Sequence, residues 1–489
     1  MGSDLFSIGH SALSTSKKSM ATTSHNIANA NNENYSRQRV TTESGTPISE
    51  GDYVVGSGVN IRSIKRTHDA LAEKKLNNSI SNHDFNKERT DQLTQVEEIF
   101  NEINSEGMNK ILNRFFNAFR ELANQPENEV VRTMVRDNAQ LVVKDFHRIN
   151  ESITRVKEGI DTKLSRSIED INQSAEKIAY LNKEIIRLEN AGGETGDLRD
   201  QRDEATRLLS EYFSVNTYED EKGQYVVNIA NTGSLVAGGA VNRLKAGKVM
   251  GTSGNGRDSE GKVDIFFEAQ TNLSISDNLK KGKLSALVKT RNEDIEFLRG
   301  ELDELAHGLA KSTNAVHRRG FANKELPTDQ NGNVINDGSA GVVTGINFFK
   351  EPLAKDRAAE YIELADEIKG DLNNISTALA PNAPGDNRVA IAISKLQHEK
   401  VLGKGDTTLE EGYLKAVGKI GLTTAKTKID TEQTAGILAQ AKSIKQRISG
   451  VSLDEETANL VKYQHSYDAS ARVIKAADEM FDSVLGMMR

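Results

Sequence analysis

The segment Met20–Val40, MATTSHNIANANNENYSRQRV, decides how this chain is organised. It opens with residues that suit a helix and then carries five asparagines, at positions 26, 29, 31, 32 and 34. Asparagine is unfavourable inside a helix because its side-chain amide competes for backbone hydrogen bonds. The run therefore predicts the end of an N-terminal helix. We expect turns and left-handed conformations from Asn29 to Asn34, and an extended connector from Tyr35 to Arg39.

Large apolar residues recur every seven positions before this break and again near the C-terminus. Seven-residue spacing places such residues on one stripe of a helix. The N-terminal stripe consists of Phe6, Leu13, Met20 and Ile27, and the neighbouring positions Gly9, Ser16, Thr23 and Ala30 are small. The C-terminal stripe consists of Leu453, Leu460, Tyr467, Ile474, Phe481 and Met488. We expect the two helices to pack on each other or on neighbouring subunits. The alternative is that they are ordinary amphipathic helices in separate cores.

The composition favours an elongated protein with narrow helical cores. The chain has 489 residues, which is enough for several domains. Hydrophobic residues make up only 36% and aromatic residues 5%, and tryptophan is absent. These fractions are low for a compact enzyme of this size. The 6 prolines also leave room for long uninterrupted helices.

Charge and cysteine content disfavour several classes of function. The net charge is −8, from 63 basic and 71 acidic residues that are interspersed, so no basic block indicates nucleic-acid binding. No apolar run approaches the roughly 18 residues of a transmembrane helix. The N-terminus shows no basic region followed by an apolar one, so we expect no cleaved signal peptide. The absence of cysteine excludes disulfides and thiolate metal sites.

The helical parts of the chain fall into two groups. Residues 1–60 and 450–489 predict a terminal domain in which the two end helices pair in a coiled-coil-like manner. Residues 65–205, 277–317 and 355–449 predict a bundle of long helices, because apolar residues recur at steps of three or four. The longest such run extends from Ile149 to Leu188, and glycines at positions 192 and 193 predict its end.

Two further segments differ from the helical ones. Residues 206–276 are rich in β-branched and aromatic residues between glycine clusters, which predicts an inserted outer β domain. Residues 318–354 are rich in loop-forming residues, and we leave their domain open. The predicted fold class is mainly α with an inserted β domain, elongated and multi-domain.

Two short motifs resemble ligand-binding loops but lack the residues that would bind. The segment GRDSEGKV at 256–263 has Val263 where a phosphate-binding loop needs Ser or Thr, and a strand rather than a helix follows. The segment DQNGNV at 329–334 has Val334 and Ala340 where a calcium loop needs Gly and Glu. We interpret both as polar turns. Without HExxH or G-x-S-x-G, we predict no catalytic, cofactor or metal site, and no enzyme.

The asparagine-rich segment carries a resemblance to a known family. SHNIANAN at 24–31, followed by YSRQ at 35–38, resembles the N-terminal signature of the bacterial flagellar axial proteins, which include rod, hook and hook-associated proteins. The residues that carry this motif are Asn26, Asn29, Asn31, Tyr35 and Arg37. Segments at 449–456, 459–464 and 471–478 resemble the matching C-terminal end. LRDQRD at 198–203, with GDN at 385–387, is most similar to the hook-associated members.

The resemblance implies a structural role outside the cell. The terminal helices would line the inner tube around the export channel, and the chain would form a ring joining hook to filament. Its partners would be the hook protein, a second junction protein, copies of itself, the flagellar export apparatus and an export chaperone at the C-terminal helix. No cofactor, nucleic acid or membrane insertion is implied. Export would need no cleaved signal peptide.

The resemblance also turns the two apolar stripes into candidate assembly interfaces. These are Phe6, Leu13, Met20 and Ile27 at one end, and Leu453, Leu460, Tyr467, Ile474 and Phe481 at the other. Asn34 stands where family members usually have glycine before the tyrosine, and asparagine tolerates the left-handed backbone better than most residues. The alternatives are a rod or hook component, a cytosolic coiled-coil scaffold, and an enzyme carried on the outer domain.

Overall fold

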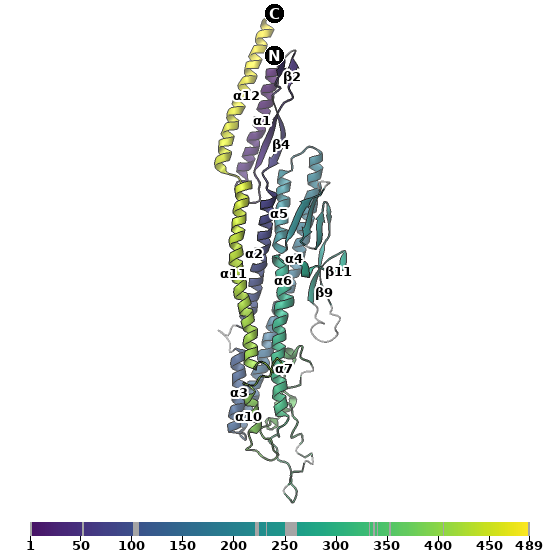
Figure 1. Cartoon of the computed structure of the whole chain (residues 1–489), viewed down its shortest axis with the longest axis vertical. Coiled ribbons are helices and arrows are strands. Elements are labelled where there is room, and N and C mark those ends of the chain that lie inside the picture. Colours follow the sequence, from purple (N-terminus) through teal and green to yellow (C-terminus); the bar gives the residue numbers. More distant parts are fainter. Residues whose placement is uncertain are drawn as a thin grey trace.

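The protein is a long, narrow rod whose two chain ends lie at the same pole (Figure 1). The computed structural model describes residues 2–50, 53–100, 107–220, 224–230, 232–249, 262–331, 333–335, 338–339, 341–351, 354–403 and 405–487. Helices run along most of the rod, and antiparallel strands lie on one flank. The predicted fold class, mainly helical and elongated with an inserted region of strands, is confirmed.

The pole consists of the two end helices lying side by side (Figure 1). Helix α1 (Gly2–Ala28) packs along α12 (Leu453–Met487). The prediction that the chain ends pack on each other is therefore confirmed. Helix α1 ends at the asparagine run, where the N–H of Asn29 donates to the carbonyl of His25 at 3.2 Å and a series of turns follows.

Short strands connect α1 to the rod. Strand β1 (Gln38–Ser44) pairs antiparallel with β4 (Val59–Arg66), and a bulge follows Thr41. Between them, β2 (Ile48–Glu50) pairs with β3 (Tyr53–Val55). Because β1 and β4 both contact α1, the chain travels up beside this helix and returns to its lower end before the rod begins.

The rod is built from helices that follow its axis. They are α2 (Ala70–Ile99), α3 (Met108–Asn124), α4 (Glu129–Asn190), α5 (Gly196–Tyr212), α6 (Gly282–Lys289), α7 (Glu296–His317) and α11 (Leu409–Ser449). A short π-helical stretch, Thr290–Ile295, joins α6 to α7. Helix α2 packs between α11 on one side and α5 and α6 on the other.

Helix α4 is the spine of the rod, with 62 residues. The side chain of Asn128 caps its start by accepting from the N–H of Val130 at 2.9 Å. Its apolar residues recur at three- and four-residue steps and are buried along nearly the whole length. The helix ends as predicted at the glycine pair: Gly192 has φ +74°, and the N–H of Gly193 donates to Leu188 at 2.8 Å.

Two antiparallel sheets lie on the flank of α4. The first contains β5 (Val215–Glu219), β6 (Tyr225–Ile229), β7 (Gly233–Ala237) and β8 (Ala240–Val241) in that order. The second has the order β11 (Gln270–Ser274), β10 (Lys262–Phe267), β9 (Leu244–Val249). The strands start at Val215, because residues 206–212 continue α5. Of the segment resembling a phosphate loop, 256–261 lie outside the described residues, and Lys262 and Val263 belong to β10.

The end of the rod opposite the termini is less regular. Between α7 and α11 the helices are short: α8 (Ala358–Tyr361), α9 (Asp366–Gly370), the 3-10 turn Leu372–Asn374 and α10 (Arg388–Lys395). The segment that resembles a calcium loop is a polar turn, in which Asp329 accepts from the N–H groups of Asn331 and Asn333 at 2.9 and 2.7 Å. In the described part of the chain, no group of three or more His, Asp or Glu side chains could hold a metal ion.

Two buried basic side chains hold this end together. Arg132 donates to the carbonyls of Pro126 and Ile375 at 2.7 and 2.6 Å, and burial lowers its pKa to about 10. His317 lies between the carbonyl of Ile346, 2.7 Å from Nδ1, and the N–H of Ser376, 2.9 Å from Nε2. Nδ1 therefore carries the proton and the ring is neutral. Burial, with help from the charge of Arg132, lowers the pKa of His317 to about 4.

This histidine predicts a loss of local stability in acid. The pKa of this side chain in the unfolded chain is about 6.5. Between that pH and about 4, His317 is therefore protonated in the unfolded state and neutral in the folded state. The free energy of opening around Ser376 should fall as pH drops from about 6.5 to about 4, by at most about 3 kcal/mol. Hydrogen exchange of a peptide containing Ser376, corrected for the intrinsic rate, measures it. The variant His317→Gln should lose this dependence, and an unchanged dependence would contradict the assignment.

Candidate assembly site

The family-motif residues meet at a joint where α1, the connector, α5 and α12 come together. Asn26, in the last turn of α1, is almost completely buried. Its Nδ2 donates to the carbonyl of Gln38 at 2.9 Å and to Glu456 Oε2 at 3.0 Å. Its Oδ1 accepts from the hydroxyl of Tyr35 at 2.7 Å and the N–H of Gln38 at 3.0 Å. All four hydrogen-bonding positions of this amide are thus used inside the chain.

Arg37 joins the connector to the start of α12. Its Nε lies 2.6 Å from Glu456 Oε1, and its Nη1 lies 2.6 Å from Glu455 Oε2. Its backbone N–H donates to Ser449, the last residue of α11, at 2.9 Å. Burial acts to lower the pKa of Arg37, but hydrogen bonds and charge from both glutamates outweigh it and raise the pKa. Since Arg37 and Glu456 are both buried, neither charge has water to replace its partner.

The start of α5 supplies the third side of the joint. Asp200 accepts from the N–H of Ser36 at 2.7 Å. Asp200 and Asp203 also bind the Arg66 guanidinium, at 2.8 and 2.6 Å, which ties the end of β4 to α5. Both aspartates belong to the LRDQRD segment whose resemblance was noted in the sequence. The sequence pattern marked this segment, but gave no sign that it would contact the connector.

The connector turns without a left-handed asparagine, so the expectation for Asn34 was wrong. Among the described residues, only Arg357 and Asn382 have positive φ outside glycine. The side chain of Asn32 accepts from the N–H of Asn34 at 3.0 Å, and this turn changes the direction of the chain. The side chain of Asn34 donates to Glu204 of α5 at 2.8 Å. An amide can make this contact and glycine cannot.

The other motif residues differ in burial. Tyr35 is buried, and its hydroxyl also lies 3.1 Å from His25 Nδ1. Burial, then the charges of nearby carboxylates, raise the pKa of Tyr35, so it stays a neutral donor. Asn29 donates back to the carbonyl of His25 at 3.0 Å and finishes the helix. Asn31 is exposed.

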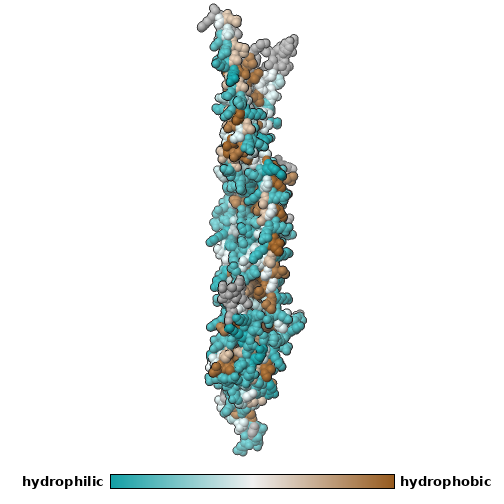
Figure 2. All heavy atoms as spheres, turned by 90° about the vertical axis from the view of Figure 1, so that its left-hand side faces the viewer, coloured by the Kyte–Doolittle hydropathy of each residue, from teal (hydrophilic) through white to brown (hydrophobic). Residues whose placement is uncertain are grey.

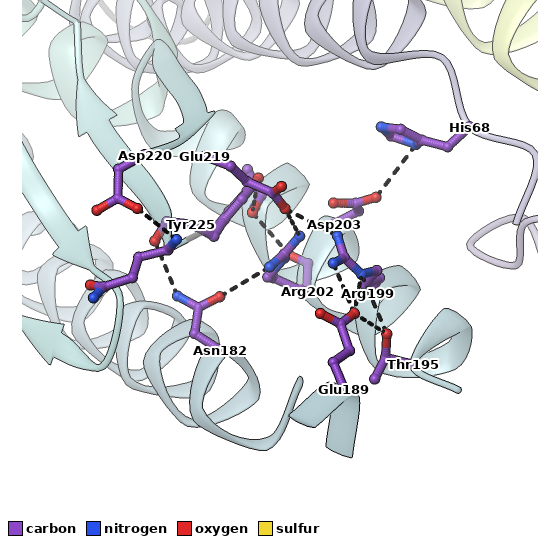
Figure 3. A network of polar contacts seen from close by, with 12 residues as sticks. His68, Asn182, Glu189, Thr195, Arg199, Arg202, Asp203, Glu219, Asp220 and Tyr225 are labelled. Atoms are coloured by element: carbon purple, nitrogen blue, oxygen red, sulfur yellow. Dashed lines mark hydrogen bonds and ion pairs between the residues drawn. The ribbon is translucent and has the colours of Figure 1, made fainter. Parts of the chain in front are cut away.

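A second polar network connects the joint to the outer strands (Figure 3). Arg202 of α5 is buried, with its guanidinium 3.8 Å from the centre of the Tyr225 ring of β6 and Nη1 3.3 Å from Asn182 of α4. Burial lowers the pKa of Arg202. Arg199, one turn earlier, binds Glu189 of α4 and Glu219 of β5 at 2.9 and 3.0 Å. One short helix thus links the spine, the sheet and the joint.

Comparisons with known proteins show what the chain is similar to. The family description "Flagellar hook-associated protein FlgK helical domain" matches residues 93–334, and "Flagellar basal body rod FlgEFG protein C-terminal" matches residues 446–487. The flagellar hook-associated protein 1 of Bacillus subtilis is 28% identical, over 98% of this chain and 96% of that protein. That of Salmonella typhimurium is 24% identical, over 99% and 100%. Along nearly its whole length, the chain is similar to flagellar hook-associated protein 1.

A solved structure shares the fold. The flagellar hook junction protein FlgK from Burkholderia pseudomallei aligns with a TM-score of 0.61 at 15% sequence identity. The alignment covers 77% of this chain and 100% of that one. The resemblance of the terminal motifs to flagellar axial proteins is thus confirmed, and the joint described above lies where the N-terminal motif, the LRDQRD segment and the C-terminal match meet.

The face of α1 that is turned toward α12 carries small residues. A Cβ added to Gly9 would lie 2.7 Å from a side-chain carbon of Ile474. The side chain of Ile474 therefore packs directly against the backbone of α1 at this position. The hydroxyl oxygens of Ser16 and Ser466 lie 3.3 Å apart, and Thr23 is buried. Of the large N-terminal stripe, Leu13, Met20 and Ile27 are half-buried, and Phe6 is exposed.

The C-terminal stripe divides in the same way. Leu460, Tyr467 and Ile474 are half-buried in the pair with α1, whereas Leu453 and Phe481 are exposed. The structure therefore brings three members of each stripe into the terminal pair and leaves Phe6, Leu453 and Phe481 exposed, while Met488 lies outside the described residues. Their role in assembly stays a prediction. Sequence reasoning did not single out Glu456 or Arg66, whose partners lie far away in the sequence.

The joint predicts a difference between two adjacent glutamates. The side chain of Glu456 is 2% exposed and that of Glu455 is 60% exposed, although both bind Arg37. Glu456→Gln removes the buried one of the two carboxylates that pair with Arg37 and leaves only the exposed Glu455, at a cost of up to about 3–5 kcal/mol. Glu455→Gln removes an exposed pair worth under about 1 kcal/mol. Hydrogen exchange across residues 26–40 and 450–460 should rise strongly only in Glu456→Gln, and equal protection in both variants would contradict this account.

Proposed function

We propose that this protein is a structural subunit of the ring that joins the flagellar hook to the filament, and that it works by packing rather than chemistry. The observation that carries the proposal is the joint, because Asn26, Tyr35 and Arg37 of the family motif connect the terminal helices to the segment that leads to the rod. No motif residue is left with a free reactive group in a pocket built for a substrate. The relatives are named as hook-associated proteins, and we assign the chain no catalytic role.

Assembly depends on the apolar side chains that the terminal pair leaves uncovered. These include Leu5, Phe6, Leu453, Val461, Val473, Met480 and Phe481. When a neighbour covers one of these side chains, burial stabilises the contact by on the order of 25 cal/mol per Å² of apolar surface removed from water. We infer that copies of the chain in the ring, the hook protein on one side and a second junction protein on the other provide this cover. The terminal parts (1–60 and 450–489) would lie innermost, the helical rod next and the strands of 206–276 outermost.

Before export, the same surfaces need a temporary partner. We infer that an export chaperone covers the C-terminal helix, where Met480, Phe481 and Met487 are exposed near the chain end. The chain would leave through the flagellar export apparatus without a cleaved signal peptide and reside in the flagellum outside the cell. No helix in the described part of the chain is long and apolar enough to cross a membrane.

A substitution on the exposed stripe tests this function. Phe481 is 56% exposed, so Phe481→Asp should leave the terminal pair folded and remove an apolar contact with a neighbour. In cells lacking the native protein, this variant should support a complete hook but shed filament subunits into the medium. Mass spectrometry of sheared hook–filament fractions measures its incorporation. Lys475→Asp, on the polar face of the same helix, is the control and should incorporate normally.

Two outcomes would contradict the proposal. Normal filaments from Phe481→Asp would show that this face is not an assembly contact. Loss of the hook itself in cells lacking the protein would instead indicate a hook or rod component.

A further inference from the structure

The middle of α11 has its polar residues inside and its large apolar residues outside. Thr424 and Thr427 are buried, and Thr431 faces α2, where its hydroxyl lies 3.0 Å from that of Thr90. On the outward side, Leu422 is 74% exposed and Ile429 is 66% exposed. A helix on the surface of a monomeric protein normally shows the opposite arrangement.

The inward threonines are satisfied within their own helix. The hydroxyls of Thr424, Thr427 and Thr431 donate to backbone carbonyls three or four residues earlier, at 2.7–3.0 Å. Over this stretch the inward side of α11 packs through threonines, and its large buried apolar residues, Tyr413 and Ile420, lie nearer its start. Leu422 and Ile429 contribute little to the folding of the single chain, because most of their surface stays in water.

Two glycines lie on the same outward side. Nothing lies within 4 Å of a Cβ added to Gly418 or Gly436, so no contact among the described residues requires glycine there. Glycine inside a helix costs about 0.5–1 kcal/mol relative to alanine. Between large residues, it leaves a depression into which a neighbour's side chain can pack. The glycines thus indicate, independently of the exposed leucines, that another chain approaches α11 closely.

The charges beside this face favour an acidic partner. Lys415, Lys426 and Lys428 are exposed beside this face, together with one acidic residue, Glu432. The chain as a whole has a net charge of −8. A second copy of this chain, which is acidic overall, is therefore a partner of the favoured charge.

We propose that the outward face of α11, formed by Leu414, Gly418, Leu422, Ile429 and Gly436 and named the α11 stripe, is a lateral contact with a second copy of this chain. The proposal rests on the proposed function, since the ring is what sets copies side by side. Figure 2, viewed from the side on which α11 forms the edge of the rod, shows apolar residues along the middle of the rod and over the terminal pair. Copies would thus meet along the rod as well as through the terminal helices.

Photo-crosslinking identifies what covers the stripe. A benzophenone amino acid replaces Leu422, and the matched control replaces Leu141, an exposed leucine on α4. Intact flagella carrying each protein are irradiated. The Leu422 probe should give an adduct of twice the 53.6 kDa chain mass that contains only peptides of this protein, and the control should not. An adduct with any other protein, or none at all, overturns the proposal.

A charge substitution gives the functional test. The double variant Leu422→Lys/Ile429→Lys should keep the helical circular dichroism and thermal midpoint of the native chain, because both side chains are exposed. Its incorporation into hook–filament fractions should fall at least about tenfold, the factor that corresponds to about 1.4 kcal/mol. Leu141→Lys should incorporate normally.

The outcomes separate this inference from the proposed function. If the native protein is absent from the hook–filament fraction, both the proposed function and the α11 contact are overturned. Native protein that is present, with the double variant incorporated equally well, overturns the α11 contact alone.

Discussion

The buried ion pair between Arg37 and Glu456 is the contact on which the architecture depends. It joins residues 419 positions apart and fixes the start of α12 to the connector that leaves α1. Removing either partner leaves a charge in a place that water does not reach, which is far more costly than losing an exposed pair. Asn26, with four hydrogen bonds, and Asp200 complete the joint. The terminal pair and the rod are therefore held as one unit, although only a short segment of chain connects α1 to the rest.

The helices of the molecule have two kinds of apolar face: one is buried within the chain, and the other is exposed. The inner face of α4 is buried along its length and makes the rod stable by itself. The outer faces of α1, α12 and α11 carry leucine, isoleucine and phenylalanine that remain exposed among the described residues. Between α1 and α12 the contact is made by small residues such as Gly9 and Ser16. Other large residues of these helices, such as Phe6 and Phe481, stay exposed.

Sequence reasoning predicted what depends on local patterns. The period of apolar residues gave the long helix α4 and the terminal helices, and the glycine pair marked the end of α4. It could not give the partners of Arg37, because an ion pair across 419 residues leaves no periodic signal. Asn34 was misjudged because residue preference alone cannot tell a left-handed backbone from a turn closed by the side chain of Asn32. In α11, the spacing of apolar residues in the sequence shows a stripe, but it does not show whether that stripe faces the rod or the solvent.

The most direct test of the central claim measures how firmly the joint holds the terminal pair to the rod. The chain has no cysteine, so two introduced cysteines, replacing Lys475 on α12 and Lys87 on α2, can be spin-labelled without side reactions. Pulsed electron paramagnetic resonance then gives the distribution of distances between the two labels. We predict a single narrow distribution for the native joint and a broad one after Arg37→Gln. An equally narrow distribution in both proteins would contradict the account.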